Sequence, residues 1–142
     1  MGSIKLKEIL ISPLQRIYSP GGDVLHGMKS EDVGFSGFGE AYFSLVANGK
    51  VKGWKRHNKM NMNLVVPVGE VRFVFYYETN ETFQVVDIGE KNYQRITVPA
   101  GIWFGFQGRV YGESVVLNLA DINHSSEEVE SKAIGELKYS WD

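Results

Sequence analysis

Two apolar runs that meet at a glycine carry the strongest fold signal in this chain. They read Leu64-Val65-Val66-Pro67-Val68-Gly69 and then Glu70-Val71-Arg72-Phe73-Val74-Phe75-Tyr76-Tyr77. In the second run every odd position is apolar or aromatic, whereas Glu70 and Arg72 occupy even positions. Because successive side chains of a strand point to opposite faces, this alternation predicts a strand with one face in the core. The Pro67-Val68-Gly69 sequence predicts the turn between the two runs.

Segments of strand-like composition recur along most of the chain, separated by turn signals such as Pro20-Gly21-Gly22-Asp23 and Pro99-Ala100-Gly101. They are rich in Val, Phe and Tyr, and they span residues 35–46, 64–68, 70–77, 83–88, 93–98 and 114–120. Many short strands at this spacing are typical of a β-sandwich or barrel, so we predict an all-β fold. The exception is the C-terminus, where a capping serine followed by acids predicts a short helix within residues 125–137.

A cluster of five cations and one histidine follows a predicted hairpin. The pair Asn48-Gly49 separates residues 42–47 from residues 50–54, and both residue types tolerate the positive φ of two-residue hairpin turns. The cluster after it reads Lys50-Val51-Lys52-Gly53-Trp54-Lys55-Arg56-His57-Asn58-Lys59. It is either a solvated basic loop or, folded over a cavity, an anion site that presents a titratable base.

Length and composition limit the kind of protein. A chain of 142 residues, 43% hydrophobic and 23% charged, suits a single domain over residues 1–142. Its net charge of −2 offers no overall attraction to nucleic acid or to membranes, and we expect neither as a partner. There is no cysteine, no apolar run that could cross a bilayer, and no signal peptide at the first residues. We therefore expect a cytoplasmic protein.

The motifs of several enzyme classes are absent from the sequence. The histidines His26, His57 and His124 form no His-X-His or HExxH pattern, so we expect no metal and no other cofactor. His26 and His124 are interpreted as structural or solvated. No GxSxG elbow, Walker loop or dinucleotide fingerprint is present. Proton transfer next to an activated ketone needs none of these motifs; for such a reaction His57 is the candidate base and Lys55 or Arg56 the candidate electrophile.

The order and spacing of several segments resemble the cupin-type sugar-nucleotide enzymes, the family of dTDP-4-dehydrorhamnose 3,5-epimerases and dTDP-4-oxo-6-deoxyhexose 3,4-ketoisomerases. The resemblance covers about residues 22–125, and its skeleton is Gly22-Asp23, Glu40-Ala41-Tyr42-Phe43-Ser44, Lys50-Val51-Lys52-Gly53-Trp54, Gly69-Glu70-Val71 and residues 92–106. It implies a cupin jelly-roll β-sandwich and a nucleotide-sugar substrate. It also implies a homodimer whose partners exchange an N-terminal strand or supply pocket residues.

The resemblance also implies roles for individual residues. Matched on Gly53, the family's arginine falls on Lys52 and its catalytic histidine on Lys55, two positions before His57. Lys55 and His57 project to the same face of a continuing strand, so either is a candidate for the catalytic base. The predicted substrate-binding residues are Lys52, Arg56, Glu40, Tyr42, Asn63 and Trp103. Of the cations, Lys50 and Lys52 are predicted to hold the diphosphate.

The sequence departs from the family pattern at two positions. The family's assisting lysine appears as Asn63, and its tyrosine acid falls near Leu117 or Asn118. Read without the family, Glu40 is a surface strand residue and Trp103 a core residue. We interpret the chain as an epimerase or ketoisomerase of a nucleotide-linked 4-keto-6-deoxy sugar, in surface-polysaccharide (O-antigen or capsule) synthesis. The alternative is a non-catalytic cupin that binds a sugar nucleotide or carbohydrate.

Overall fold

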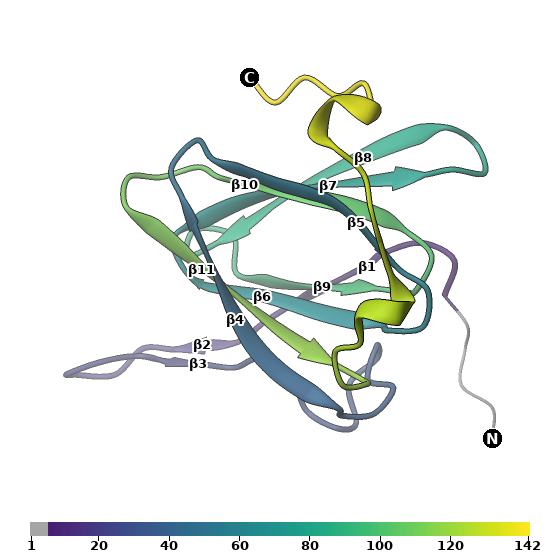
Figure 1. The fold of residues 1–142 in the computed structure, drawn as a ribbon. Helices are drawn as coiled ribbons and strands as arrows, with labels where there is room; N and C mark the ends of the chain where they lie inside the picture. The colour runs from purple at the N-terminus through teal and green to yellow at the C-terminus, as the bar shows by residue number, and fades with distance from the viewer. Residues whose placement is uncertain (1–5) are drawn as a thin grey trace.

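Two five-stranded antiparallel sheets face each other in the computed structural model, which describes residues 6–142 (Figure 1). The first, which we call the β4 sheet, has the order β1 (Leu10–Pro13), β9 (Gln94–Val98), β6 (Met62–Val68), β11 (Glu113–Ala120) and β4 (Glu40–Ala47). The second, the β5 sheet, has the order β12 (Val129–Ser131), β5 (Val51–His57), β10 (Trp103–Gly108), β7 (Glu70–Tyr77) and β8 (Thr82–Gly89). Strands β2 (Arg16–Ile17) and β3 (Val24–Leu25) form a separate two-stranded ribbon. The all-β prediction is confirmed; the chain start, on which the signal-peptide expectation rests, lies largely outside these residues.

The alternation in β7 has the predicted effect. Val71, Phe73 and Phe75 are buried in the main core, which fills the space between the sheets. The opposite face of β7 is not fully solvated, because Val74 is also buried, in a second cluster with Trp54 and Trp103. The C-terminal segment covers this second cluster with Leu137, Tyr139 and Trp141. The β5 sheet therefore packs apolar side chains on both of its faces.

The predicted C-terminal helix is wrong. Residues 126–136 contain two single 3-10 turns, η1 (Ser126–Glu128) and η2 (Ile134–Glu136), with strand β12 between them. A helix this short gains little on its own, since its few hydrogen bonds hardly offset the cost of nucleation. Pairing with β5 offers the same residues a hydrogen-bonded edge and a place against the outer cluster.

The predicted hairpin at Asn48-Gly49 is also wrong, although the turn itself forms. The Lys50 amide donates to the Ala47 carbonyl at 3.1 Å, and Gly49 has a φ of 78°. The flanking strands do not pair with each other, because β4 pairs with β11 while β5 pairs with β10 and β12. The turn is thus a corner between the sheets. An Asn-Gly pair indicates that the chain reverses direction. Which strands then pair depends on how the inner faces of both sheets are buried.

Strand β10 was not predicted; Gly105 and Gly108 interrupt its aromatic run. Gly105 lies in mid-strand where the Trp54 and Trp141 rings approach the backbone, and an added Cβ would come within 3.2 Å of both. The glycine therefore serves close packing and not a turn. The predicted segment 35–46 begins five residues too early, since β4 starts at Glu40.

Gly69 forms a second corner between the sheets, where β6 ends and β7 begins. Its φ is +90°, and a Cβ would lie 2.1 Å from Oγ of Ser114, which is fully buried. Gly101 has a similar φ of +95° but open space around it. A substitution at Gly101 therefore tests backbone strain alone, whereas the same substitution at Gly69 tests backbone strain together with steric overlap.

We expect Gly101→Ala to lower the free energy of unfolding by about 1–2 kcal/mol, the cost of a left-handed backbone for an L-residue. Gly69→Ala pays this cost and also overpacks the corner, which adds about 1–3 kcal/mol. Urea unfolding of both variants measures the difference. Equal losses in the two variants would show that the corner at Ser114 can expand freely.

Candidate functional site

A cavity of about 440 Å³ lies between the two sheets and opens to solvent. Both sheets contribute to its wall, and the polar residues in the lining are Tyr42, Ser44, Lys52, Lys55, His57, Asn118 and His124. The apolar part of the wall includes Leu64, Phe73, Phe104, Phe106 and Val116. Aromatic faces beside a few polar groups suit a ring-shaped ligand that carries hydroxyls.

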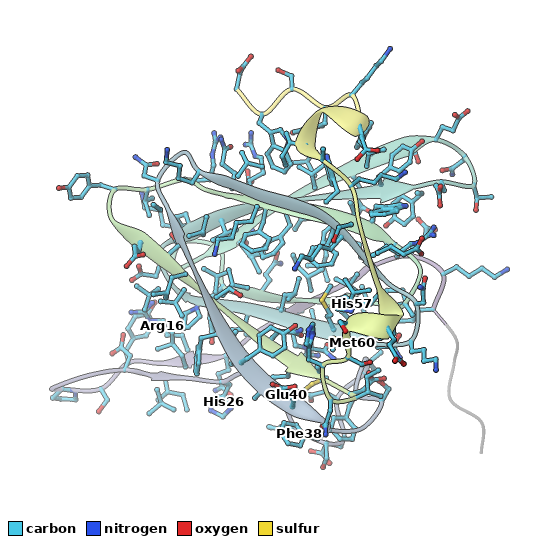
Figure 2. The ribbon with its side chains drawn as sticks, in the orientation of Figure 1. Arg16, His26, Phe38, Glu40, His57 and Met60 are labelled. Carbon is cyan, nitrogen blue, oxygen red and sulfur yellow. The ribbon has the colours of Figure 1, made fainter. Side chains whose placement is uncertain are left out.

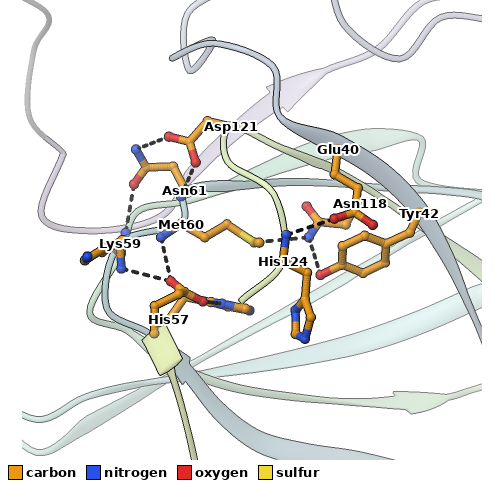
Figure 3. A network of polar contacts seen from close by, with 11 residues as sticks. Glu40, Tyr42, His57, Lys59, Met60, Asn61, Asn118, Asp121 and His124 are labelled. Carbon is orange, nitrogen blue, oxygen red and sulfur yellow. Dashed lines mark hydrogen bonds and ion pairs between the residues drawn. The ribbon is translucent and has the colours of Figure 1, made fainter. Parts of the chain in front are cut away.

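His57, at the end of β5, is paired with Glu128. Strand β12 aligns Val129 with His57, so the residue before it, Glu128, reaches the imidazole. His57 Nδ1 and Glu128 Oε2 are 2.5 Å apart, and each residue is only 5% exposed. The other carboxylate oxygen accepts the amides of Lys59 at 3.0 Å and Met60 at 2.9 Å, as Figure 3 shows. The carboxylate thus joins the imidazole to the turn after β5.

The surroundings of Glu128 favour its charged form and determine the tautomer of His57. Burial raises the pKa of Glu128, but hydrogen bonds from His57 and from the Met60 and Lys59 amides outweigh it, so that the pKa lies below its usual value. Because a carboxylate only accepts hydrogen bonds, Nδ1 of His57 carries a hydrogen, and in the neutral imidazole Nε2 then presents a lone pair. Phe104 stacks on the ring, with centroids 5.9 Å apart and planes at 13°. In its neutral form the imidazole is therefore a proton acceptor of fixed orientation in the cavity wall.

A bulge in β5 brings two lysines to the cavity. Phe104 pairs with Lys55 and Phe106 with Lys52, so β5 has one more residue than β10 over this stretch. Lys52 and Lys55 consequently both line the cavity, while Trp54 between them points to the outer cluster. Both lysines are exposed, and they form a cationic edge that can bind an anion. Lys50, which was predicted to share this role, is exposed and outside the lining.

The β4 sheet contributes a tyrosine and an asparagine from adjacent strands. Tyr42 of β4 pairs in register with Asn118 of β11, and Asn118 Nδ2 donates to the phenol oxygen at 2.9 Å. Burial raises the pKa of Tyr42, and the nearby Glu40 and Glu128 carboxylates add to this, whereas the Asn118 hydrogen bond opposes it. The net effect raises the pKa, so the phenol is protonated at neutral pH. Tyr42 and His57 reach the cavity from facing sheets.

Arg56 and Trp103 lie outside the cavity, on the outer face of the β5 sheet. The Arg56 guanidinium pairs with Glu130 at 2.6 Å and with Glu78, and it lies 4.9 Å from the Trp103 ring centroid. Trp103 is 3% exposed and belongs to the outer cluster with Trp54. Strand alternation explains this placement, because both residues neighbour one that faces the cavity. Their positions do not support the predicted contact with a substrate in this cavity.

Asn63 and Glu40 are also absent from the lining. Asn63 lies on the outer face of β6, where its Oδ1 accepts from Thr97 at 2.6 Å and from Arg95 at 3.2 Å. Glu40 begins β4 and accepts the His124 amide at 2.9 Å, which fastens the loop after β11 (Figure 3). Asn63 is a structural residue of the outer face, and Glu40 supports the cavity rim without lining it.

The histidines differ in position from one another. His124 is exposed, in agreement with the interpretation as structural or solvated, but it also lines the cavity, which the sequence did not indicate. His26 follows β3, at the ribbon away from His57 (Figure 2), and its carbonyl accepts the Tyr93 hydroxyl at 2.7 Å. Glu128 was missed altogether, because its only signal was an acid after a predicted helix cap.

Two further observations limit the site. Within residues 6–142, no group of three or more His, Asp or Glu side chains is arranged to hold a metal ion. In the same part of the chain, no helix combines the length and the apolar character needed to span a membrane.

We expect Glu128 to make folding stability depend on pH. Its folded pKa lies below the unfolded one, so its contribution is complete above about pH 4.3 and is lost as the pH falls through the folded pKa. Urea unfolding at about pH 5 and about pH 3, both below the ordinary histidine range, should therefore show a larger loss for the wild type than for Glu128→Gln. Glu127→Gln, at the exposed neighbouring residue, is the control and should behave as the wild type. A wild-type loss no larger than that of Glu128→Gln would contradict the assignment.

Comparison with known proteins finds related solved structures, although no family sequence profile and no curated protein sequence matches the chain. A dTDP sugar isomerase from Desulfovibrio desulfuricans is 34% identical with a TM-score of 0.90, over 95% of this chain and 91% of that one. A sugar 3,4-ketoisomerase from Thermoanaerobacterium thermosaccharolyticum, in complex with TDP, is 16% identical with a TM-score of 0.75, over 94% and 96%. A dTDP-6-deoxy-D-glucose-3,5-epimerase from Legionella pneumophila, in complex with dTDP-4-keto-L-rhamnose, is 16% identical with a TM-score of 0.79, over 98% and 81%. The last two similarities show a shared fold.

Proposed function

Because the chain belongs to the cupin-type family of dTDP-sugar epimerases and isomerases, we propose that it isomerises a nucleotide-linked 4-keto-6-deoxy sugar. Family membership confirms the predicted cupin jelly-roll and the predicted enzyme class. The observation that carries the proposal is the buried His57–Glu128 pair at the wall of an aromatic cavity. We also propose that the protein is a homodimer and that it acts in surface-polysaccharide synthesis.

The first step is the removal of a proton next to the keto group. The carbonyl acidifies the neighbouring C–H bond, and neutral Nε2 of His57 takes the proton while the electron pair forms an enolate. Glu128 holds the tautomer that this step needs and stabilises the imidazolium that results. Of the two predicted bases, His57 is favoured over Lys55 because it is the one in contact with the carboxylate. Lys55, two residues earlier on the same face, is then the cation for the enolate oxygen.

The second step returns a proton to the carbon. Tyr42 is protonated and faces the cavity from the sheet opposite His57, so it can deliver its proton to the other face of the sugar. Removal on one face and return on the other inverts the carbon. This arrangement favours epimerisation over 3,4-ketoisomerisation. His57 afterwards releases its proton to water and the Tyr42 phenolate regains one, which balances the cycle.

Lys52 is the proposed ligand of the diphosphate. It lines the cavity three residues before Lys55 and is exposed, so a charged group at the opening can reach it without being fully desolvated. Such a contact contributes the same energy before and after proton removal, and it therefore serves binding and orientation.

Proton NMR in deuterium oxide with dTDP-4-keto-6-deoxyglucose tests the proposal. We expect the wild type to exchange the C3 or C5 proton, and His57→Gln to slow this by about 100-fold or more because the base is lost. Glu128→Gln should slow exchange by a similar factor, since its amide would donate to Nδ1 and reverse the tautomer.

His26→Gln, at a histidine outside the cavity, is the control and should exchange at the wild-type rate. Full activity in His57→Gln would remove His57 as the base. Saturable binding without exchange in the wild type would favour the non-catalytic cupin. No binding would exclude this nucleotide sugar as the ligand.

Steady-state kinetics should distinguish the roles of Lys50, Lys52 and Lys55. Lys52→Gln should raise KM by roughly tenfold with little change in kcat, because a uniform binding contact is lost. Lys55→Gln should lower kcat by roughly 100-fold, as expected for an electrophile that acts on the enolate. Lys50→Gln, at an exposed site outside the lining, should change neither. If Lys50→Gln and Lys52→Gln behave alike, the cations act only through their summed field.

A further inference from the structure

Asn118 occupies an unfavourable position for an amide. It is 3% exposed on the inner face of β11, and its Oδ1 is buried with no hydrogen-bond partner among the described residues. Its Nδ2 has two contacts, with the Tyr42 phenol oxygen at 2.9 Å and the Met60 sulfur at 3.7 Å. An unpaired buried carbonyl oxygen costs free energy, whereas a leucine of similar size would cost none. Packing alone therefore does not account for an asparagine at this position.

The geometry of the phenol suggests what the amide does. A tyrosine hydroxyl has one hydrogen and two lone pairs, and the Asn118 N–H occupies one of the lone pairs. The phenolic hydrogen consequently cannot point at Asn118. Tyr42 lines the cavity, so the space in front of its hydroxyl is where a ligand would lie.

We propose that Asn118 is a positioning residue for inversion: its amide holds the Tyr42 oxygen and turns the phenolic hydrogen into the cavity. This inference rests on the proposed function, in which Tyr42 returns the proton. Asn118 also lines the cavity, but the role proposed for it is exerted through Tyr42, whose oxygen it holds.

If the inference is correct, hydrogen–deuterium exchange and inversion of the carbon respond differently to a change at Asn118. His57 alone can remove a proton and, after the imidazolium exchanges with deuterium oxide, return deuterium to the same face. This gives labelled substrate of unchanged configuration. Inversion also needs the hydrogen of Tyr42. The ratio of inverted product to labelled substrate therefore reports on Asn118 separately from His57.

Two replacements disturb the contact in different ways. Leucine removes the N–H donor and leaves the phenol free to rotate. Aspartate keeps the size of the side chain but presents only acceptors, so the phenolic hydrogen would point to residue 118 and away from the cavity. Both should lose inversion, whereas Asn118→Leu should also remove the unpaired oxygen and keep the wild-type melting temperature or exceed it.

The experiment is proton NMR in deuterium oxide with dTDP-4-keto-6-deoxyglucose. It compares the wild type with Asn118→Leu, Asn118→Asp, Tyr42→Phe and the double variant that combines Asn118→Leu with Tyr42→Phe. We expect Asn118→Leu to exchange within about threefold of the wild-type rate while its ratio of inverted product to labelled substrate falls at least about tenfold. The double variant should match Tyr42→Phe, because the two residues act as one unit. Asn118→Asp gives the same test if the leucine variant does not fold.

Two results would overturn the inference while the proposed function stands. One is an unchanged ratio in the Asn118 variants. The other is an equal loss of exchange and inversion together with a lower melting temperature, which marks a structural residue. A wild type that binds the sugar nucleotide but neither exchanges nor inverts would overturn the proposed function and this inference with it.

Discussion

The buried carboxylate of Glu128 is the constraint on which the site depends. A carboxylate with 5% exposure is stable only if its oxygens are satisfied, and the available donors are the His57 imidazole and the Lys59 and Met60 amides. These donors come from the end of β5 and the turn after it, whereas Glu128 comes from the C-terminal segment. Satisfying one charge therefore sets the position of β12, the path of the turn and the orientation of the imidazole together.

Strand β5 serves the cavity with one face and the C-terminal segment with the other. Lys52, Lys55 and His57 line the cavity, while Trp54 packs against the Trp141 ring at a centroid distance of 5.4 Å. The Trp54 indole also donates to the Ile134 carbonyl at 3.0 Å. The segment that supplies Glu128 is thus held by the outer face of the strand that carries His57. This explains why the β5 sheet packs apolar side chains on both faces.

Prediction from sequence succeeded where the signal was local. The period-2 alternation located the inner face of β7, and the same period placed Lys55 and His57 on one face of β5, which the structure shows for both. One error arose where distant segments compete. The Asn48-Gly49 turn forms without a hairpin because β4 and β5 pair with other strands. Arg56 and Trp103 were misplaced for a local reason, since strand alternation puts each of them on the outer face beside a residue that lines the cavity.

The sequence by itself determined the all-β architecture, the single well-placed histidine of the basic cluster and the lack of recognised motifs for other chemistry. Only the tertiary structure decided which side chains contact the site residues His57 and Tyr42. Glu128 is 71 residues from His57, and Asn118 is 76 residues from Tyr42. Each pair meets because two strands align in an antiparallel register that no local pattern encodes. The physical reason is that side-chain direction depends on the residue's own strand, whereas contact depends on pairing energies summed over the whole sandwich.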